Sequence, residues 1–214
     1  ILDGKANDYN GKDKGYESYG AGIYASGGVV ENCLVRGNSA YPTETASQPV
    51  NVFGGGLYAD GPVTVVNCTF VDNVAGQPAA SAGGIQLGSA DATVVNCVFF
   101  NNGGTAVTEF GGVNLGCFSH CASSVDNEQC GSWQVIDETA FTDWANRGEN
   151  VANLKPAKGL VNPLVNAGGK LADYTDFGAI SMTDLLGAPR FCGAKVDLGC
   201  IEGGSKPGAA FLLR

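Results

Sequence analysis

Hydrophobic and polar positions recur in the same order in three stretches of the chain. Each stretch has a Gly–hydrophobic pair, then a valine-rich segment that ends in Asn-Cys, and finally an Asn five residues after the cysteine. The cysteines are Cys33, Cys68 and Cys97, offset by 35 and 29 residues. Unequal offsets with a constant internal spacing predict a repeated structural unit joined by loops of variable length.

Within each repeat the hydrophobic positions alternate with a period of two, which is typical of β-strands. Stacking the repeats as coils of a parallel β-solenoid places equivalent side chains about 4.8 Å apart. The cysteine and the residue two positions later point inward, whereas Leu34, Thr69 and Val98 point outward. Two internal ladders are therefore predicted: Ile23 with Leu57 and Ile85, and Val35 with Phe70 and Phe99.

Two asparagine positions also recur, one just before each cysteine and one five residues after it. Asparagine tolerates unusual backbone angles, and its side-chain amide can hydrogen-bond along a stack of turns. The predicted turn ladders are Asn32, Asn67 and Asn96, and Asn38, Asn73 and Asn102.

The repeat fades after about Cys117, which divides the chain into three parts. Residues 1–116 are predicted to form β-helix coils with loop insertions, and residues 117–202 the last coils and an irregular closing region of the same domain that covers one end of the stack. Residues 203–214 form a C-terminal tail. The fold class is thus all-β, with many glycines and few charges in support.

The amino-acid composition restricts the classes of partner that the chain is expected to bind. The net charge is -9, which disfavours nucleic acids and anionic membranes because binding to phosphate needs clustered Lys and Arg. No apolar run is long enough to predict membrane insertion. Eight cysteines in a glycine-rich chain favour an extracellular or cell-surface location, and a chain that begins at Ile1 is interpreted as a mature or trimmed product.

The repeats resemble the GG-x-I and F-x-x-N repeats of bacterial polymorphic outer-membrane proteins, at 55–57 with 70–73 and at 83–85 with 99–102. The first repeat departs from that pattern, with Val35 at the Phe position. Residues 163–168, 184–190 and 196–202 are similar to the closing segment of choice-of-anchor β-helix proteins. The resemblance implies a right-handed parallel β-helix on a bacterial surface, but it implies little about chemistry.

The cysteines have several interpretations. The repeat cysteines are expected to be buried thiols that act as small apolar residues. Disulfides are predicted between Cys121 and Cys130 and between Cys192 and Cys200. A zinc site formed by Cys117, His120, Cys121 and Cys130 is the alternative to a disulfide-bonded loop.

No catalytic residues are predicted, because the outward positions hold no paired carboxylates and only Arg36 as a base. No cofactor is implied. Tyr24 and Tyr58 share one outward position of the repeat, followed by Gln86. They predict a glycan-binding strip, with a surface ladder that merely stabilises the stack as the alternative.

The ends of the stack are a further candidate site, because open sheet edges can pair with another chain. The residues concerned are Ile1, Leu2, Phe211, Leu212 and Leu213, which could equally mark fragment boundaries. The leading hypothesis is a non-enzymatic surface module that adheres to a cell-surface glycan or protein, or assembles with itself into fibres. A carbohydrate-binding or lyase-type β-helix is the alternative.

Overall fold

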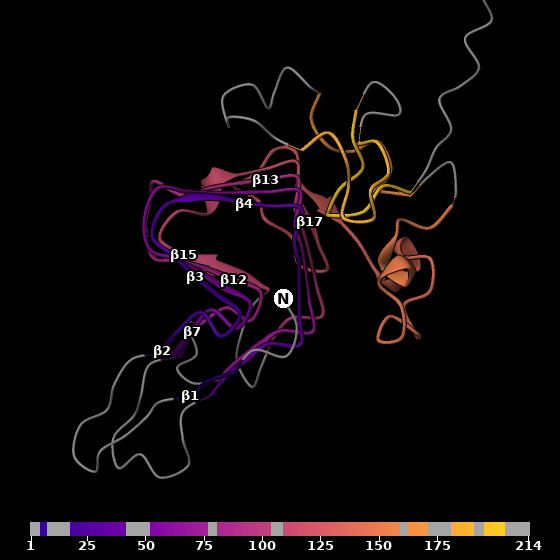
Figure 1. Cartoon of the computed structure of the whole chain (residues 1–214). Helices are drawn as coiled ribbons and strands as arrows, with labels where there is room; N and C mark the ends of the chain where they lie inside the picture. The colour runs from indigo at the N-terminus through magenta and orange to yellow at the C-terminus, as the bar shows by residue number, and fades with distance from the viewer. Residues whose placement is uncertain are drawn as a thin grey trace, which may run out of the picture.

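The computed structural model describes eight parts of the chain: residues 5–7, 18–41, 52–76, 81–103, 109–158, 162–170, 181–190 and 195–203. These residues form short strands joined by turns and a few single turns of 3-10 helix. All the strand pairs are parallel apart from two isolated antiparallel bridges in the C-terminal region. The architecture is therefore all-β and built from stacked parallel sheets, an arrangement compatible with a β-helix (Figure 1).

Three main sheets each take one strand from every repeat. The first sheet contains β3 (Ile23–Ala25), β8 (Leu57–Ala59), β12 (Ile85–Leu87) and β15 (Phe110–Gly112). The second contains β4 (Gly28–Glu31), β9 (Val63–Val66), β13 (Thr93–Val95) and β16 (Phe118–Ser119). The third contains β5 (Leu34–Arg36), β10 (Thr69–Val71), β14 (Val98–Phe100), β17 (Ala122–Ser123) and β18 (Gln134–Val135).

Two smaller sheets complete the stack. One joins β1 (Lys5–Asn7), β6 (Ser39–Tyr41) and β11 (Val74–Ala75), and the other joins β2 (Ser18–Tyr19) and β7 (Val52–Phe53). The 3-10 turns are η1 (Leu115–Cys117), η2 (Glu138–Ala140) and η3 (Val151–Leu154). No helix among the described residues is long and apolar enough to cross a membrane.

The strand register is the one that the repeat predicts. Ile23 pairs with Leu57, which pairs with Ile85, and Val35, Phe70 and Phe99 form a second row in the same way. The rings of Phe70 and Phe99 stack with centroids 5.0 Å apart in the inner core. The period-two alternation therefore orders these side chains along the stack.

A fourth copy of the repeat follows the third, but its residue types differ from those of the first three copies. Strands β15, β16 and β17 extend all three main sheets by one strand. Phe118-Ser119-His120-Cys121 occupies the place of Val94-Val95-Asn96-Cys97, and His120 has the positive φ of 48° that the asparagine before each repeat cysteine adopts. Histidine, like asparagine, tolerates this left-handed conformation better than most residues.

Most of the C-terminal region lies against the side of the stack rather than over its end. Leu34, Val71 and Val98 point outward from the third sheet, yet they are buried beneath Leu164, Leu198, Ile201 and other apolar residues of the closing region. Figure 1 shows this region, coloured orange to yellow, beside β17. Apolar side chains on the outer side of one sheet are unfavourable in water, and the closing region buries them.

Candidate functional site

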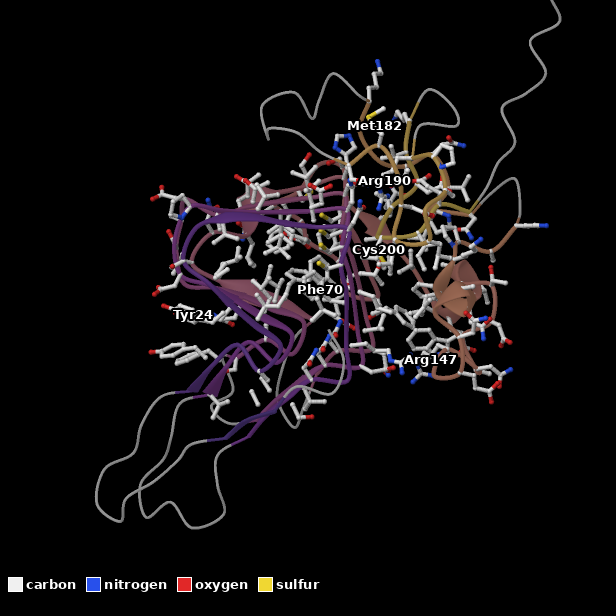
Figure 2. All side chains as sticks on the ribbon, in the orientation of Figure 1. Tyr24, Phe70, Arg147, Met182, Arg190 and Cys200 are labelled. Carbon is white, nitrogen blue, oxygen red and sulfur yellow. The ribbon has the colours of Figure 1, made fainter. Side chains whose placement is uncertain are left out.

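Tyr24 and Tyr58 lie next to each other on the outer side of the first sheet. They are register partners in β3 and β8, and their near-parallel rings have centroids 5.9 Å apart with 14° between the planes. Half of Tyr24 is exposed (51%), while Tyr58 is half-buried. Figure 2 shows the Tyr24 side chain on the outside of the stack, directed away from the core residue Phe70.

Two further rings extend this pair. Tyr19 and Phe53 are register partners in β2 and β7, and their rings stack at 5.3 Å with 13° between the planes. Tyr19 also approaches Tyr58 at 4.6 Å and Tyr24 at 6.3 Å. Tyr19, Tyr24, Phe53 and Tyr58 are called the aromatic cluster below.

Local backbone geometry brings the second pair onto the first. Gly20 and Gly54 follow Tyr19 and Phe53 directly and have φ values of 62° and 68°. A Cβ on either glycine would lie 2.1 or 2.5 Å from a backbone oxygen three residues later, so only glycine fits there. Each aromatic residue thus folds back toward the tyrosine five residues ahead. This shared spacing was the signal that the sequence prediction overlooked.

A carboxylate borders the aromatic cluster. The Tyr24 hydroxyl donates a hydrogen bond of 2.6 Å to Asp60, and this bond to an acidic side chain raises the pKa of Tyr24 above its usual 10.0. Gln86, the third residue of the predicted strip, is buried, and its side-chain oxygen accepts from the backbone N–H of Ala82. The exposed surface therefore consists of aromatic rings and Asp60, without Gln86.

The asparagines five residues after the repeat cysteines form a buried ladder. The Asn73 side-chain oxygen accepts from both the backbone and the side-chain N–H of Asn38, at 3.1 and 2.8 Å. The Asn102 side-chain oxygen accepts from the backbone and side-chain N–H of Asn73 in the same way, and the Glu109 carboxylate accepts from those of Asn102. Burial raises the pKa of Glu109, although Asn102 and Ser124 donate to its carboxylate and act in the opposite direction. The ladder thus ends on an acidic side chain with a structural role.

The asparagines before the cysteines form the turns between the second and third sheets. Asn32, Asn67 and Asn96 have φ values of 51°, 53° and 56°. The Asn96 amide donates to Asn67 at 2.5 Å and to the backbone oxygen of Asp197 at 3.0 Å. These asparagines therefore connect the stack to the closing region.

The closing motif is a buried polar network. Arg190, with no exposed surface, donates to Asn32, to the Gly199 carbonyl at 2.9 Å and to Glu202 at 2.9 Å. Asp184 accepts from three backbone N–H groups, including that of Glu202. These side chains hold the closing region in place, and their contacts are internal to the protein.

The cysteines are thiols throughout the described residues. Cys121 and Cys130 are both free, so the predicted disulfide between them is wrong. The reason is that Cys121 continues the row of Cys33, Cys68 and Cys97: its sulfur accepts from the Cys97 backbone N–H at 3.4 Å. Cys200 is also free, and its predicted partner Cys192 lies outside the described residues.

The alternative zinc site is not assembled either. No three His, Cys, Asp or Glu side chains within the described ranges are placed to hold a metal ion. His120 contacts Ser119 at 2.9 Å, and burial raises the pKa of Cys117 to about 11. A protonated, half-buried thiol is a poor ligand and a poor nucleophile.

The outward charged residues of the third sheet bind the closing region. Arg36 donates to the Arg147 carbonyl at 2.7 Å, and Arg147 forms a bidentate ion pair with Asp72 at 2.8 and 2.9 Å. The Arg147 guanidinium also lies 4.0 Å from the centre of the Trp144 ring. These contacts attach Arg36 and Asp72 to the closing region.

The two ends of the stack differ in how completely their core residues are buried. Trp133 lies against Phe110 and Phe118 of the fourth copy, with centroids 4.8 and 5.8 Å apart. At the opposite end, Ile23 and Val30 of the first repeat remain half-buried among the described residues. The residues predicted for assembly, Ile1, Leu2, Phe211, Leu212 and Leu213, lie outside the described residues.

No protein family model matches the chain, and no curated protein or solved structure is significantly similar to it.

Proposed function

We propose that the chain is a right-handed parallel β-helix module of a bacterial surface protein that acts without catalysis and adheres by binding carbohydrate through the aromatic cluster. The stacked parallel sheets and the four copies of the repeat support the β-helix. The bacterial and cell-surface parts of the proposal rest on the resemblance of the repeats and the closing motif.

One observation carries the binding proposal: two successive repeats place four aromatic rings together on one outer face, beside a carboxylate. An aromatic ring binds a sugar by packing against the flat, apolar C–H face of the sugar ring. A neighbouring polar group orients the sugar by accepting hydrogen bonds from its hydroxyls. Tyr24 is the most accessible ring (51%), and Asp60 beside it is exposed. This exposure leaves the Tyr24 ring accessible to a ligand.

Binding of the protein to an immobilised glycan array tests the proposal. The wild type is compared with Tyr24→Ala and Tyr58→Ala, and Met182→Ala is the control because Met182 is 56% exposed in the closing region. Binding that both tyrosine variants lose and the control keeps supports the proposal. Binding that is equal in the wild type and in Tyr24→Ala, or absent from the whole array, contradicts it.

Self-assembly is the second candidate function. Its support is the difference between Ile23 and Val30, which are half-buried, and their register partners Leu57 and Val65, which are completely buried. An uncovered core edge can pair with another chain. Electron microscopy at high concentration tests this candidate, since filaments with an axial repeat of one domain length support it and dispersed monomers contradict it.

A further inference from the structure

We infer that the ligand of the aromatic cluster is a neutral glycan with a flat, equatorially hydroxylated backbone of the β-glucan type, and that Asp60 selects it against acidic polysaccharides. This inference rests on the proposed function and adds the chemical class of the ligand.

The described charged residues on this face are all acidic. The cluster lies on β2, β3, β7 and β8, and the strands of the first sheet, β3, β8, β12 and β15, contain no charged residue. The turns that follow β8 and β12 add Asp60 and Asp91, and neither the strands of the first sheet nor the turns that follow them contain Lys, Arg or His. Both aspartates are exposed.

Acidic ligands need cationic partners. Sulfated sugars, uronates and phosphates are bound by Arg and Lys or by backbone N–H groups, and a like charge placed directly beside them is unfavourable. The described part of this face offers carboxylates instead, within a chain whose net charge is -9. Electrostatics therefore disfavour anionic glycans at the cluster.

The same side chains suit a neutral sugar. A carboxylate has two oxygens that accept hydrogen bonds, and only Oδ2 of Asp60 is used by Tyr24. The remaining lone pairs can accept from sugar hydroxyls beside an exposed ring. A β-glucan presents its C–H groups on the flat faces of the chain and its hydroxyls at the edges, which matches an aromatic surface bordered by an acceptor.

Two soluble polymers with the same β-1,4-glucan backbone test the inference: neutral hydroxyethyl cellulose and acidic carboxymethyl cellulose. Affinity electrophoresis at low and high salt measures binding of the wild type, Tyr24→Ala, Asp60→Asn and the control Met182→Ala. The wild type and the control are expected to bind the neutral polymer more tightly. Tyr24→Ala is expected to weaken that binding by about tenfold, as for the loss of an aromatic residue that anchors a ligand.

Asp60→Asn separates the role of charge from that of stacking. It is expected to improve binding of carboxymethyl cellulose, and the difference between the two polymers is expected to shrink at high salt as charges are screened. Equal or tighter binding of the acidic polymer by the wild type at low salt overturns the inference. Binding of neither polymer, with Tyr24-dependent binding of another glycan on the array, overturns the inference and leaves the proposed function standing.

Discussion

The buried guanidinium of Arg190 donates two hydrogen bonds to the side-chain oxygen of Asn32, a residue of the first repeat that lies 158 positions earlier. One of these bonds measures 2.9 Å. The same guanidinium pairs with Glu202 at 2.9 Å, so the first repeat and the last described part of the chain meet at one side chain. This contact attaches the closing region to the turn of the first repeat.

Replacing Arg190 is predicted to detach the closing region. Arg190→Met would leave Glu202, the Gly199 carbonyl and the Asn32 oxygen buried without their donor, at a cost of about 3 to 5 kcal/mol. Arg147→Met is the matched comparison, because Arg147 also forms an ion pair but keeps 25% of its side chain exposed. Its loss is expected to cost about 1 kcal/mol.

Urea unfolding and limited proteolysis measure both effects. The Arg190 variant is expected to unfold at a lower urea concentration and to be cut early in the closing region. If both arginine variants lose the same small amount of stability, the Arg190 network does not hold the closing region.

The pH dependence of stability provides a separate test of this network. Burial raises the pKa of Glu202 from its usual 4.5 to about 7, although Arg190 and the Asp197 backbone N–H favour its charged form. Between these two values the folded protein holds a proton that the unfolded chain releases. This contribution to stability is therefore complete below about pH 4.5 and is lost as the pH rises through 7, by at most about 3 kcal/mol.

Urea unfolding of the wild type and Glu202→Gln at several pH values between 4.5 and 7.5 measures this contribution. The wild type is expected to lose stability over this range more steeply than the variant, which has no carboxyl at this position. Glu109, whose pKa burial also raises, keeps its own contribution in both proteins. Identical pH profiles for the two proteins would show that Glu202 has an ordinary pKa.

Much of the stack could be predicted because its physical requirements are periodic. A buried apolar side chain at every second position and a fixed distance to the next turn were enough to predict the rows that begin with Ile23 and Val35. Further coils were predicted after residue 117, but the fourth copy was not aligned with the repeat because Phe118 and His120 replace the recurrent Val and Asn. They meet the same two requirements, an apolar inward position and a left-handed turn, with different residue types.

The site was less predictable than the stack. Tyr24 and Tyr58 belong to the repeat, so their register predicted the contact between them. Tyr19 and Phe53 lie before the recognised motif, and their place depends on the backbone at Gly20 and Gly54. The closing region packs on the apolar side chains that point outward from the third sheet. The period-two pattern predicted that these side chains point outward, but it could not predict that another part of the chain buries them.

The asparagine ladder is predicted to contribute substantially to stability through Asn73, which has no exposed surface. Asn73→Ala would remove the acceptor of two Asn38 N–H groups and the donor to Asn102 and the Val35 carbonyl. Each buried group left unpaired costs about 1 to 3 kcal/mol, so a loss of about 3 kcal/mol or more is expected.

Asn146→Ala is the control for the ladder, because Asn146 is exposed and, among the described residues, its side chain bonds only to Asp143 within its own turn. Its effect on the free energy of unfolding in urea is expected to stay below about 1 kcal/mol. Equal effects for the two alanine variants would contradict a structural role for the ladder.

The hydrogen bond between Tyr24 and Asp60 makes the charge beside the aromatic cluster measurable in the free protein. Because the neighbouring carboxylate disfavours the phenolate, the pKa of Tyr24 is raised above 10.0. Absorbance titration of the wild type minus Tyr24→Phe isolates this hydroxyl among the seven tyrosines. In Asp60→Asn the pKa of Tyr24 is expected to fall toward 10, since the negative charge is gone. Asp91→Asn is the matched control and should leave the midpoint where it is in the wild type. A Tyr24 midpoint that does not move in Asp60→Asn would mean that this carboxylate is not held against the ring in solution, and the selection against acidic glycans would lose its physical basis.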